Sequence, residues 1–210
     1  MRAIIVANGE MRDKGLIGRT ICDGDYIICL DGGLKYIDGT GIMPNIIVGD
    51  FDSVNIDLVE KYRKKGVEIE SFPVRKDFTD MELGIDIAVK AGAESVIFLG
   101  ALGGRLDHML GNIYNMKQAA KLGMEAGIID EKQHAFLLEK GRKFKYKKGT
   151  VISLIPISEQ VTDIKTVNLS YPLNRETLYN GYSRGLSNVF EEDEVEISFS
   201  SGILLVIVNV

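Results

Sequence analysis

The hydrophobic pattern of this chain changes character near residue 130, and that change constrains the fold more than any other feature. Before it, short apolar runs alternate with segments of helical periodicity. Most of these runs lack polar and apolar alternation, which is typical of strands buried on both faces. Strands are predicted at residues 3–7, 26–30, 45–48, 67–72 and 95–99.

Amphipathic helices are predicted between these strands. Apolar residues recur at helical spacing across residues 81–89 and again across residues 109–120. Strands that alternate with helices predict an α/β domain with a doubly wound, mostly parallel sheet.

After residue 130 helical spacing disappears. The segment 143–147 carries lysines on one face, and 194–200 carries Val195, Ile197 and Phe199 on one face. Such alternation predicts half-buried antiparallel strands. Further short strands, broken by Gly and Pro, complete a smaller, all-β, sandwich-like domain. We place the two domains at residues 1–135 and 136–210.

Composition excludes several classes of protein. The net charge is −5 and the one basic run is short, which argues against a nucleic-acid partner. No apolar stretch approaches the 18 residues of a membrane span, so no membrane attachment is expected. Residues 1–8 are interpreted as a first strand and not as a signal peptide. Cys22 and Cys29 are expected to be buried free thiols, which fits a cytoplasmic location.

Aspartates gather in three short segments, residues 49–53, 76–80 and 103–108, each of which follows a predicted strand. Ligands of a doubly wound sheet bind beyond the carboxyl ends of its strands, so the three loops can share one cleft. Two carboxylates about 4 Å apart repel by roughly 4 kcal/mol at an effective dielectric constant near 20. Converging aspartates therefore favour a cation, and Mg²⁺ with nucleotide phosphates fits best.

Asp50 and Asp52 are two residues apart, so in extended backbone they point the same way and could share a metal, with Phe51 turned into the protein. Taken alone, this segment fits a solvated turn equally well.

The next acidic segment precedes a predicted helix. Thr79 and Glu82 fit a capping box, which would place Asp80 at the first helical position and keep its carboxylate ionised for a metal. Asp77 is an alternative cap. Lys76 is either a surface charge or a phosphate contact.

The loop at residues 100–107 has glycines that would let backbone N–H groups approach an anion at the start of a helix. Arg105 could bind phosphate with two hydrogen bonds. Asp107 fits either the helix N-cap or direct chemistry, and His108 fits a helix surface position.

Two other segments allow a structural and a functional interpretation. Asp31 with its two following glycines fits a tight turn or a ligand contact at the same sheet edge. Ser187 and Asn188 fit a polar turn, or a hydrogen-bonding pair for a heteroaromatic ring.

Five ordered segments together, residues 31–33, 49–53, 76–80, 103–108 and 186–188, closely resemble the thiamine pyrophosphokinase family. The resemblance covers nearly the whole chain. It implies transfer of the pyrophosphoryl group of ATP to the hydroxyl of thiamine, which yields thiamine diphosphate and AMP. It also implies Mg²⁺, ATP as co-substrate, and a homodimer whose thiamine sites lie between subunits. The first domain would then bind ATP and Mg²⁺, and the second would bind thiamine and dimerise.

The resemblance assigns roles by position. Asp50, Asp52 and Asp80 match the metal-binding carboxylates, and these three and Arg105 match the catalytic residues. Ser187 and Asn188 match the thiamine site. The residues that match ATP contacts are Asp31, Lys76, Asp77, Thr79, Arg105, Asp107 and His108.

The chain departs from the family pattern at two places. Phe78 stands where a polar residue is common. There is no Trp to stack on the thiazolium ring, so Tyr182, Phe190 or another aromatic residue would have to do so.

Three other functions stay open at this point. A pyrophosphokinase for another hydroxymethyl heterocycle, such as a pterin, would share the metal chemistry. A glycosyltransferase with a DxD motif is a weaker alternative. A non-catalytic nucleotide-binding or thiamine-binding protein would bind in an Mg²⁺-dependent way without turnover.

Overall fold

The computed structural model describes residues 1–13, 15–51, 54–72 and 78–210, and the chain divides into two compact units. The first unit is Met1–Glu131 and the second is Lys132–Val210. The division comes a little earlier than the boundary after residue 135 that the sequence suggested, because the first strand of the second unit already begins at Gln133.

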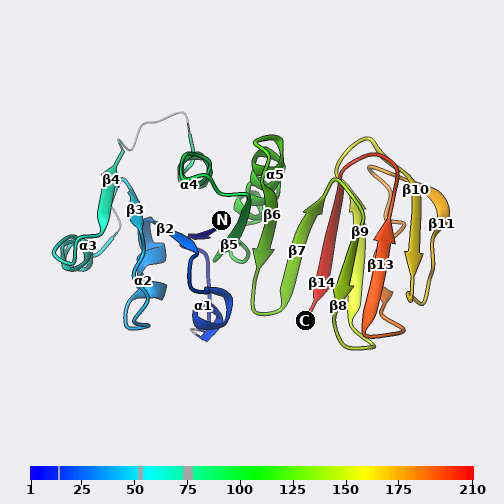
Figure 1. The fold of residues 1–210 in the computed structure, drawn as a ribbon, viewed down its shortest axis with the longest axis horizontal. Helices are drawn as coiled ribbons and strands as arrows, with labels where there is room; N and C mark the ends of the chain where they lie inside the picture. Colours follow the sequence, from blue (N-terminus) through cyan, green and yellow to red (C-terminus); the bar gives the residue numbers. More distant parts are fainter. Residues whose placement is uncertain (14, 52–53, 73–77) are drawn as a thin grey trace. The chain divides into compact units, whose positions relative to one another are not determined.

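The first unit contains a parallel sheet with the strand order β6-β5-β1-β2-β3-β4. Its strands are β1 (Arg2–Val6), β2 (Tyr26–Leu30), β3 (Ile46–Gly49), β4 (Glu68–Ser71), β5 (Ser95–Leu99) and β6 (Glu125–Ile129). The order reverses direction between β1 and β5, which pair directly (Figure 1). In such sheets the crevice beyond the carboxyl ends of the strands at the reversal is the usual ligand site.

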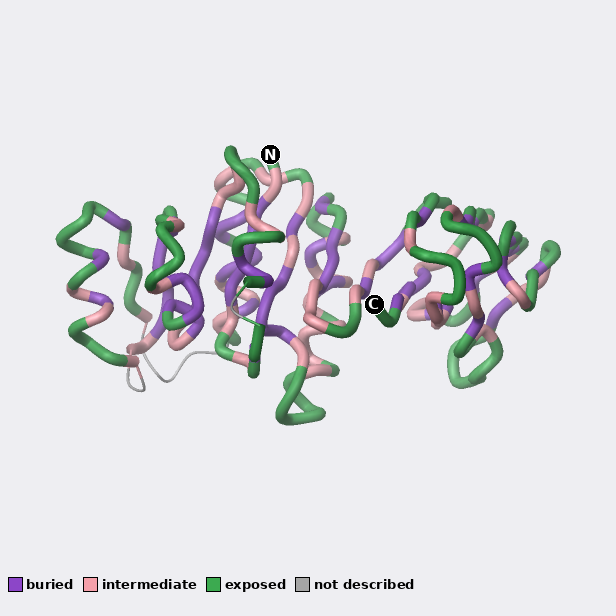
Figure 2. Tube along the Cα trace, turned by 90° about the horizontal axis from the view of Figure 1, so that it is seen from below, coloured by how far each residue is buried: buried purple, intermediate pink, exposed green. Residues whose placement is uncertain are grey.

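Helices pack on both faces of this sheet. They are α1 (Gly15–Thr20), the 3₁₀ turn η1 (Asp31–Gly33), α2 (Leu34–Ile37), α3 (Ile56–Arg63), α4 (Asp80–Lys90) and α5 (Leu106–Lys121). Ile4 and Val6 of β1 belong to one buried cluster with residues of α1, α2 and α3. Ile5 of β1 and Leu30 of β2 instead lie against Gly84 of α4. The inner strands are therefore buried on both faces, and their trace in Figure 2 is mostly purple.

The second unit is a sandwich of two antiparallel sheets. One has the order β12-β9-β14-β7, and the other has the order β11-β10-β13-β8. The strands are β7 (Gln133–Leu138), β8 (Arg142–Lys145), β9 (Val151–Pro156), β10 (Gln160–Val167), β11 (Asn174–Tyr179), β12 (Asn188–Val189), β13 (Glu194–Ser198) and β14 (Leu204–Asn209). Their inward side chains, among them Leu154, Ile164, Phe190 and Val195, form one core.

These two architectures confirm the predicted fold class. Several details differ from the sequence-based expectations: the helices α1, α2 and α3 and the strand β11 were not predicted. The strand β6 was not predicted, because its Glu-Ala-Gly start gives only a short apolar run. Cys22 is exposed and only Cys29 is buried, because Cys22 lies beyond the end of α1, in the turn before β2. No helix in the described part of the chain is long and apolar enough to cross a membrane.

Candidate active site

A cavity of about 700 Å³ opens at the carboxyl ends of the strands in the first unit. Its lining comes from the residues that follow β1, β2 and β5 and from the first turns of α4 and α5. This is the place where the strand order reverses, so the topology itself accounts for the position of the cavity.

Three aspartates interact beside this cavity: Asp31 follows β2, Asp50 follows β3, and Asp80 begins α4. Burial, followed by the hydrogen bond to Asp80 and the charge of Asp80, raises the pKa of Asp31 to about 7, with a smaller contribution from the charge of Asp50. The Phe51 N–H, which donates to Asp31 Oδ1 at 3.5 Å, acts in the opposite direction. Among the described residues, no lysine or arginine contributes to this shift. The neighbouring carboxyl groups therefore disfavour the ionised form of Asp31.

The backbone near Asp31 lets the Asp31 carboxylate lie close to Gly49. Asp31 has φ of 42° and Phe51 has φ of 58°, so both are in the left-handed region. A Cβ atom on Gly49 would overlap with the Asp31 carboxylate, so only glycine fits there. The Phe51 ring packs against the buried cluster, in agreement with the expectation that it turns inward.

The start of α4 places Asp80 at the first helical position. Thr79 is the N-cap residue, and its hydroxyl oxygen accepts from the Glu82 N–H at 3.3 Å. In return the Thr79 N–H donates to Glu82 Oε2 at 2.7 Å, which completes the capping box. The predicted cap is thus present. The predicted site residues Asp52, Lys76 and Asp77 lie outside the described residues.

The glycine-rich loop before α5 has left-handed backbone at Gly100, Gly103 and Gly104. From within α5, Asn112 Nδ2 donates to the Ala101 carbonyl at 2.7 Å and ties the loop to the helix. Arg105 occupies the N-cap position without capping through its side chain. The helix therefore begins without a side-chain cap, at the wall of the cavity.

Asp107 is not the N-cap, which corrects one of the two sequence interpretations. It lies inside the first turn, where its carboxylate accepts from Arg105 Nε at 3.1 Å and from Arg105 Nη2 at 2.6 Å. It also accepts from the His108 N–H at 3.0 Å. The hydrogen bond from Arg105 lowers the pKa of Asp107, so this carboxylate is ionised and holds Arg105 at the cavity wall.

A second cavity of about 360 Å³ lies in the second unit, between the segments 171–173 and 183–188. Ser187 lines it and is exposed, with φ of 54°. Asn188 also lines it, but its side chain is used within the fold: it accepts from the Tyr171 N–H at 3.0 Å and donates to the Tyr171 carbonyl at 2.7 Å. Asn188 therefore joins the two walls of the cavity.

The aromatic residues of the second unit differ in their access to this cavity. Phe190 is only 1% exposed, in the core, so it is not available for stacking. Tyr182 is exposed and packs edge-on against Tyr179. Tyr171 lines the cavity and is 71% exposed.

Sequence reasoning missed several residues that line the larger cavity. Asn8, Gly9 and Glu10 follow β1, and Asn112 and Asn115 lie on one face of α5. The position of residues 8–10 directly after the first strand was a usable signal, because a doubly wound sheet reverses beside that strand.

The described residues contain no group of three or more His, Cys, Asp or Glu side chains that could hold a metal ion by themselves. Asp31, Asp50 and Asp80 lie close enough to interact and supply hard oxygen donors, which suit Mg²⁺. Because Mg²⁺ commonly takes one or two protein carboxylates together with substrate phosphates and water, a complete protein cage is not required.

Comparison with known proteins identifies the family. A family model described as the thiamin pyrophosphokinase catalytic domain matches residues 18–128, and one described as the thiamin pyrophosphokinase vitamin B1 binding domain matches residues 134–204. The chain belongs to the thiamin pyrophosphokinase family. The resemblance inferred from the five motifs is thereby confirmed.

Individual family members agree with this result. A thiamine pyrophosphokinase from Bacillus subtilis (strain 168) is 30% identical over 182 residues, which are 86% of this chain and 85% of that protein. A crystal structure of thiamine pyrophosphokinase from Bacillus subtilis matches with a TM-score of 0.89 at 27% identity, and covers 100% of this chain and 99% of its own. One from Geobacillus thermodenitrificans matches with a TM-score of 0.84 at 27% identity, and covers 100% and 98%.

Proposed function

We propose that this chain transfers the pyrophosphoryl group of ATP to the hydroxyl of thiamine in an Mg²⁺-dependent reaction that yields thiamine diphosphate and AMP. The observation that carries the proposal is the cavity at the strand reversal, where Asp31, Asp80 and Arg105 come together from three loops. The crevice at a strand reversal is the usual nucleotide site of such a sheet, and membership of the thiamin pyrophosphokinase family supports ATP as the nucleotide.

Arg105 and the start of α5 would bind the phosphates. The guanidinium is exposed and already oriented by Asp107, so it can donate to phosphate oxygens while one carboxylate holds it in place. The N-cap residue Arg105 makes no side-chain cap hydrogen bond, and anions are favoured at such a helix end, although the His108 N–H already donates to Asp107. His108, Thr79 and Asp31 also line the cavity and would complete the contacts to ATP.

Asp50, Asp52 and Asp80 would hold Mg²⁺ together with phosphate oxygens of ATP. Bound there, the metal would neutralise charge on the transferring phosphates. Asp31, which shares a hydrogen bond with Asp80, would help to fix the Asp80 carboxylate. Lys76 and Asp77, from the segment before Thr79, are proposed as further ATP contacts.

The second cavity would receive thiamine. Ser187 lines the cavity and is exposed, so its hydroxyl suits a hydrogen bond to the aminopyrimidine. Asn188 would act through its two hydrogen bonds to Tyr171, which shape the cavity. The exposed Tyr171 ring offers a face to the thiazolium cation, in place of the Trp that the chain lacks.

The reaction itself needs no protein nucleophile. The hydroxyl oxygen of thiamine forms a bond to the β-phosphorus of ATP and gives its proton to a nearby aspartate. The bond from that phosphorus to the α,β-bridging oxygen breaks, and AMP leaves. Positioning of the reactants and stabilisation of negative charge provide most of the acceleration in such transfers. Arg105 and the three metal-binding aspartates are accordingly the proposed catalytic residues.

We also propose that the protein acts as a homodimer in the cytoplasm, with its thiamine sites between subunits. The family resemblance assigns dimerisation to the second unit. In addition, Leu106, Leu110 and Tyr114 are exposed at intervals of four residues along α5 of the first unit, and a second subunit would cover such apolar surface. The free thiols of Cys22 and Cys29 suit a reducing compartment. Sedimentation of the purified protein would test the dimer.

One incubation tests the main proposal. The protein is mixed with ATP, Mg²⁺ and either thiamine or a hydroxymethyl pterin, and the products are separated. AMP formed in proportion to thiamine diphosphate supports the proposal. Formation of thiamine monophosphate and ADP would contradict the proposal and indicate a simple kinase. Turnover of the pterin and not of thiamine would show that the proposed acceptor is wrong.

A further inference from the structure

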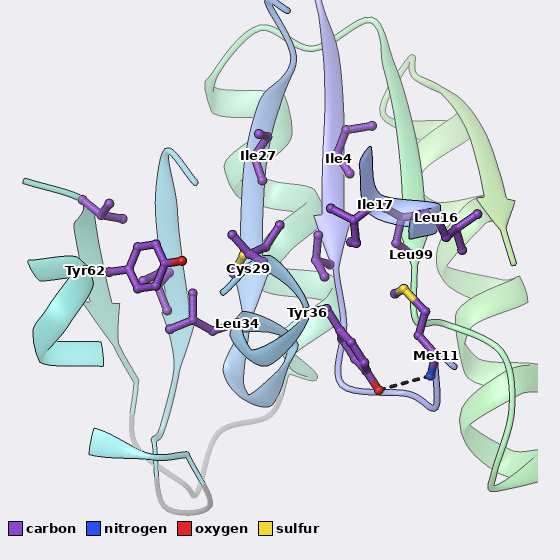
Figure 3. Packing of buried hydrophobic residues seen from close by; sticks show 14 of the residues in the cluster. Ile4, Met11, Leu16, Ile17, Ile27, Cys29, Leu34, Tyr36, Tyr62 and Leu99 are labelled. Atoms are coloured by element: carbon purple, nitrogen blue, oxygen red, sulfur yellow. Dashed lines mark hydrogen bonds between the residues drawn. The ribbon is translucent and has the colours of Figure 1, made fainter. Parts of the chain in front are cut away.

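The loop after β1 forms part of the wall of the larger cavity through Asn8, Gly9 and Glu10. Behind this wall lies Tyr36 of α2, and its hydroxyl makes two hydrogen bonds to the loop. It donates to the Gly9 carbonyl at 2.7 Å and accepts from the Met11 N–H at 3.1 Å. Figure 3 shows the second of these bonds, with the Tyr36 ring running from the helix to the loop.

Tyr36 is well placed to restrain the loop. Its side chain is 8% exposed and belongs to the same buried cluster as Met11 and Leu34. Water has little access to this hydroxyl, so the two backbone groups of the loop depend on it as their partner. Removal of the hydroxyl would leave the buried Met11 N–H without that partner.

The restraint extends to the neighbouring loops of the cavity. The Gly9 N–H donates to the Gly100 carbonyl at 2.9 Å, and Gly100 begins the loop that carries Arg105. A Cβ atom on Gly9 would overlap with that carbonyl, so the two loops are in direct contact. On the other side, Lys35 Nζ donates to Asn8 Oδ1 at 2.7 Å.

We propose that Tyr36 is a positioning residue for nucleotide binding: through Gly9 and Met11 it fixes the wall formed by residues 8–10, and through Gly9 and Gly100 it fixes the glycine-rich loop. The inference rests on the proposed function only in naming ATP as the ligand. Tyr36 acts through the backbone of the loop and does not itself touch the substrate.

Tyr36→Phe is the direct test, because it removes the hydroxyl and keeps the buried ring. Loss of one partner of a buried hydrogen bond is large enough to change an equilibrium by about tenfold. We therefore expect the dissociation constant for a non-hydrolysable ATP analogue with Mg²⁺, and the KM for ATP, to rise about tenfold. The KM for thiamine should stay within about twofold, since the thiamine cavity has separate walls.

Tyr62→Phe provides a matched control. Tyr62 is 2% exposed in the same buried cluster, and its hydroxyl donates to Asp38 Oδ1 at 3.3 Å. The two variants thus remove the same group from the same core. Only Tyr36 is bonded to a loop of the cavity, so Tyr62→Phe should lower the melting temperature without changing ATP affinity.

The experiment measures analogue affinity, both KM values and melting temperature for the wild type and the two variants. If Tyr36→Phe binds the analogue as tightly as the wild type does, or if both variants weaken analogue binding equally, the proposed positioning role is wrong. A wild type that binds the analogue but forms no AMP with thiamine would refute the proposed function and leave this test intact. A wild type that does not bind the analogue would overturn the inference as well.

A second measurement needs no variant, in case Tyr36→Phe does not fold. Hydrogen exchange of the Met11 amide in the wild type should be slow and should slow further when the analogue binds. Exchange at the rate of an unprotected loop, or exchange unaffected by the analogue, would contradict the inference.

Discussion

Asp31 and Asp80 share a hydrogen bond between their carboxyl groups, one from the end of β2 and the other from the first position of α4. A hydrogen bond between two carboxyl groups requires a proton. Burial together with this contact is what raises the pKa of Asp31 to about 7. In the absence of metal, Asp31 is therefore protonated below about pH 7, at the site where the proposed function places a cation.

This relationship predicts how stability depends on pH. Because the pKa of Asp31 is higher in the folded state than the usual value near 3.9, the folded state binds this proton more tightly. The resulting stabilisation is complete below about pH 4 and is lost as the pH rises through about 7. In EDTA, the free energy of unfolding of the wild type should fall over this range relative to Asp31→Asn. Denaturant titrations at several pH values measure the difference in the free energy of unfolding between the two proteins. A difference that does not change with pH would contradict the raised pKa of Asp31.

Asp50→Asn should remove activity without unfolding the protein. A metal-binding carboxylate that acts on the transferring phosphates is expected to contribute about a hundredfold or more to turnover. The substitution also removes a charge that raises the pKa of Asp31, so stability without metal should be unchanged or slightly higher. Rates of AMP release and melting temperatures with and without Mg²⁺ test both statements. A variant with near-normal turnover, or with the full thermal stabilisation by Mg²⁺, would exclude Asp50 from the metal site.

Thr79 links helix stability to the position of Asp80. Thr79→Ala should cost about 1 kcal/mol of stability through loss of the cap, and it should raise the KM for ATP because the first turn of α4 loosens around Asp80. Thr79→Ser keeps the hydroxyl and should restore both values. Denaturant unfolding and steady-state kinetics provide the measurements. Failure of Ser to restore ATP affinity would mean that the Thr79 methyl group, and not the cap, is responsible.

Tyr171→Ala should weaken binding of the acceptor thiamine and leave binding of ATP unchanged. Loss of an aromatic face over a cation costs on the order of 1 kcal/mol, so the KM for thiamine should rise about fivefold while the KM for ATP stays unchanged. Tyr171→Phe should behave like the wild type. Tyr182→Ala removes an equally exposed ring that does not line the described cavity, and it should leave both KM values unchanged. If Tyr182→Ala raises the KM for thiamine and Tyr171→Ala does not, the assignment of Tyr171 as the stacking residue is wrong.

The features that sequence predicted well are those fixed by neighbouring residues. The Thr79 and Glu82 capping box needs only three residues of spacing, and the buried strands are recognisable from their apolar runs. Asp107 shows the limit of local reasoning. An aspartate near an arginine can either cap a helix or form an ion pair, and here Asp107 is the second residue of α5 and pairs with Arg105.

The contacts that sequence could not predict join distant segments. The Asp31 carboxylate fits only because Gly49, at the end of β3, has no side chain. The two residues are neighbours because β2 pairs with β3 in the sheet. Tyr36 gave no signal, because a buried tyrosine is common and its hydrogen bonds to Gly9 and Met11 depend on how α2 is placed. Asn188 was recognised as part of a motif, yet its bonds to Tyr171 depend on how the two segments meet.

The two described cavities draw their walls from separate stretches of the chain, the larger from residues 7–115 and the smaller from residues 171–188. If the smaller cavity binds the acceptor, as proposed, laboratory evolution toward a new acceptor can randomise the second stretch and leave the proposed phosphate-binding residues unchanged. Selection in such a library would then act on acceptor binding. The pyrophosphoryl donor and the acceptor would in that case be independently adjustable in one gene.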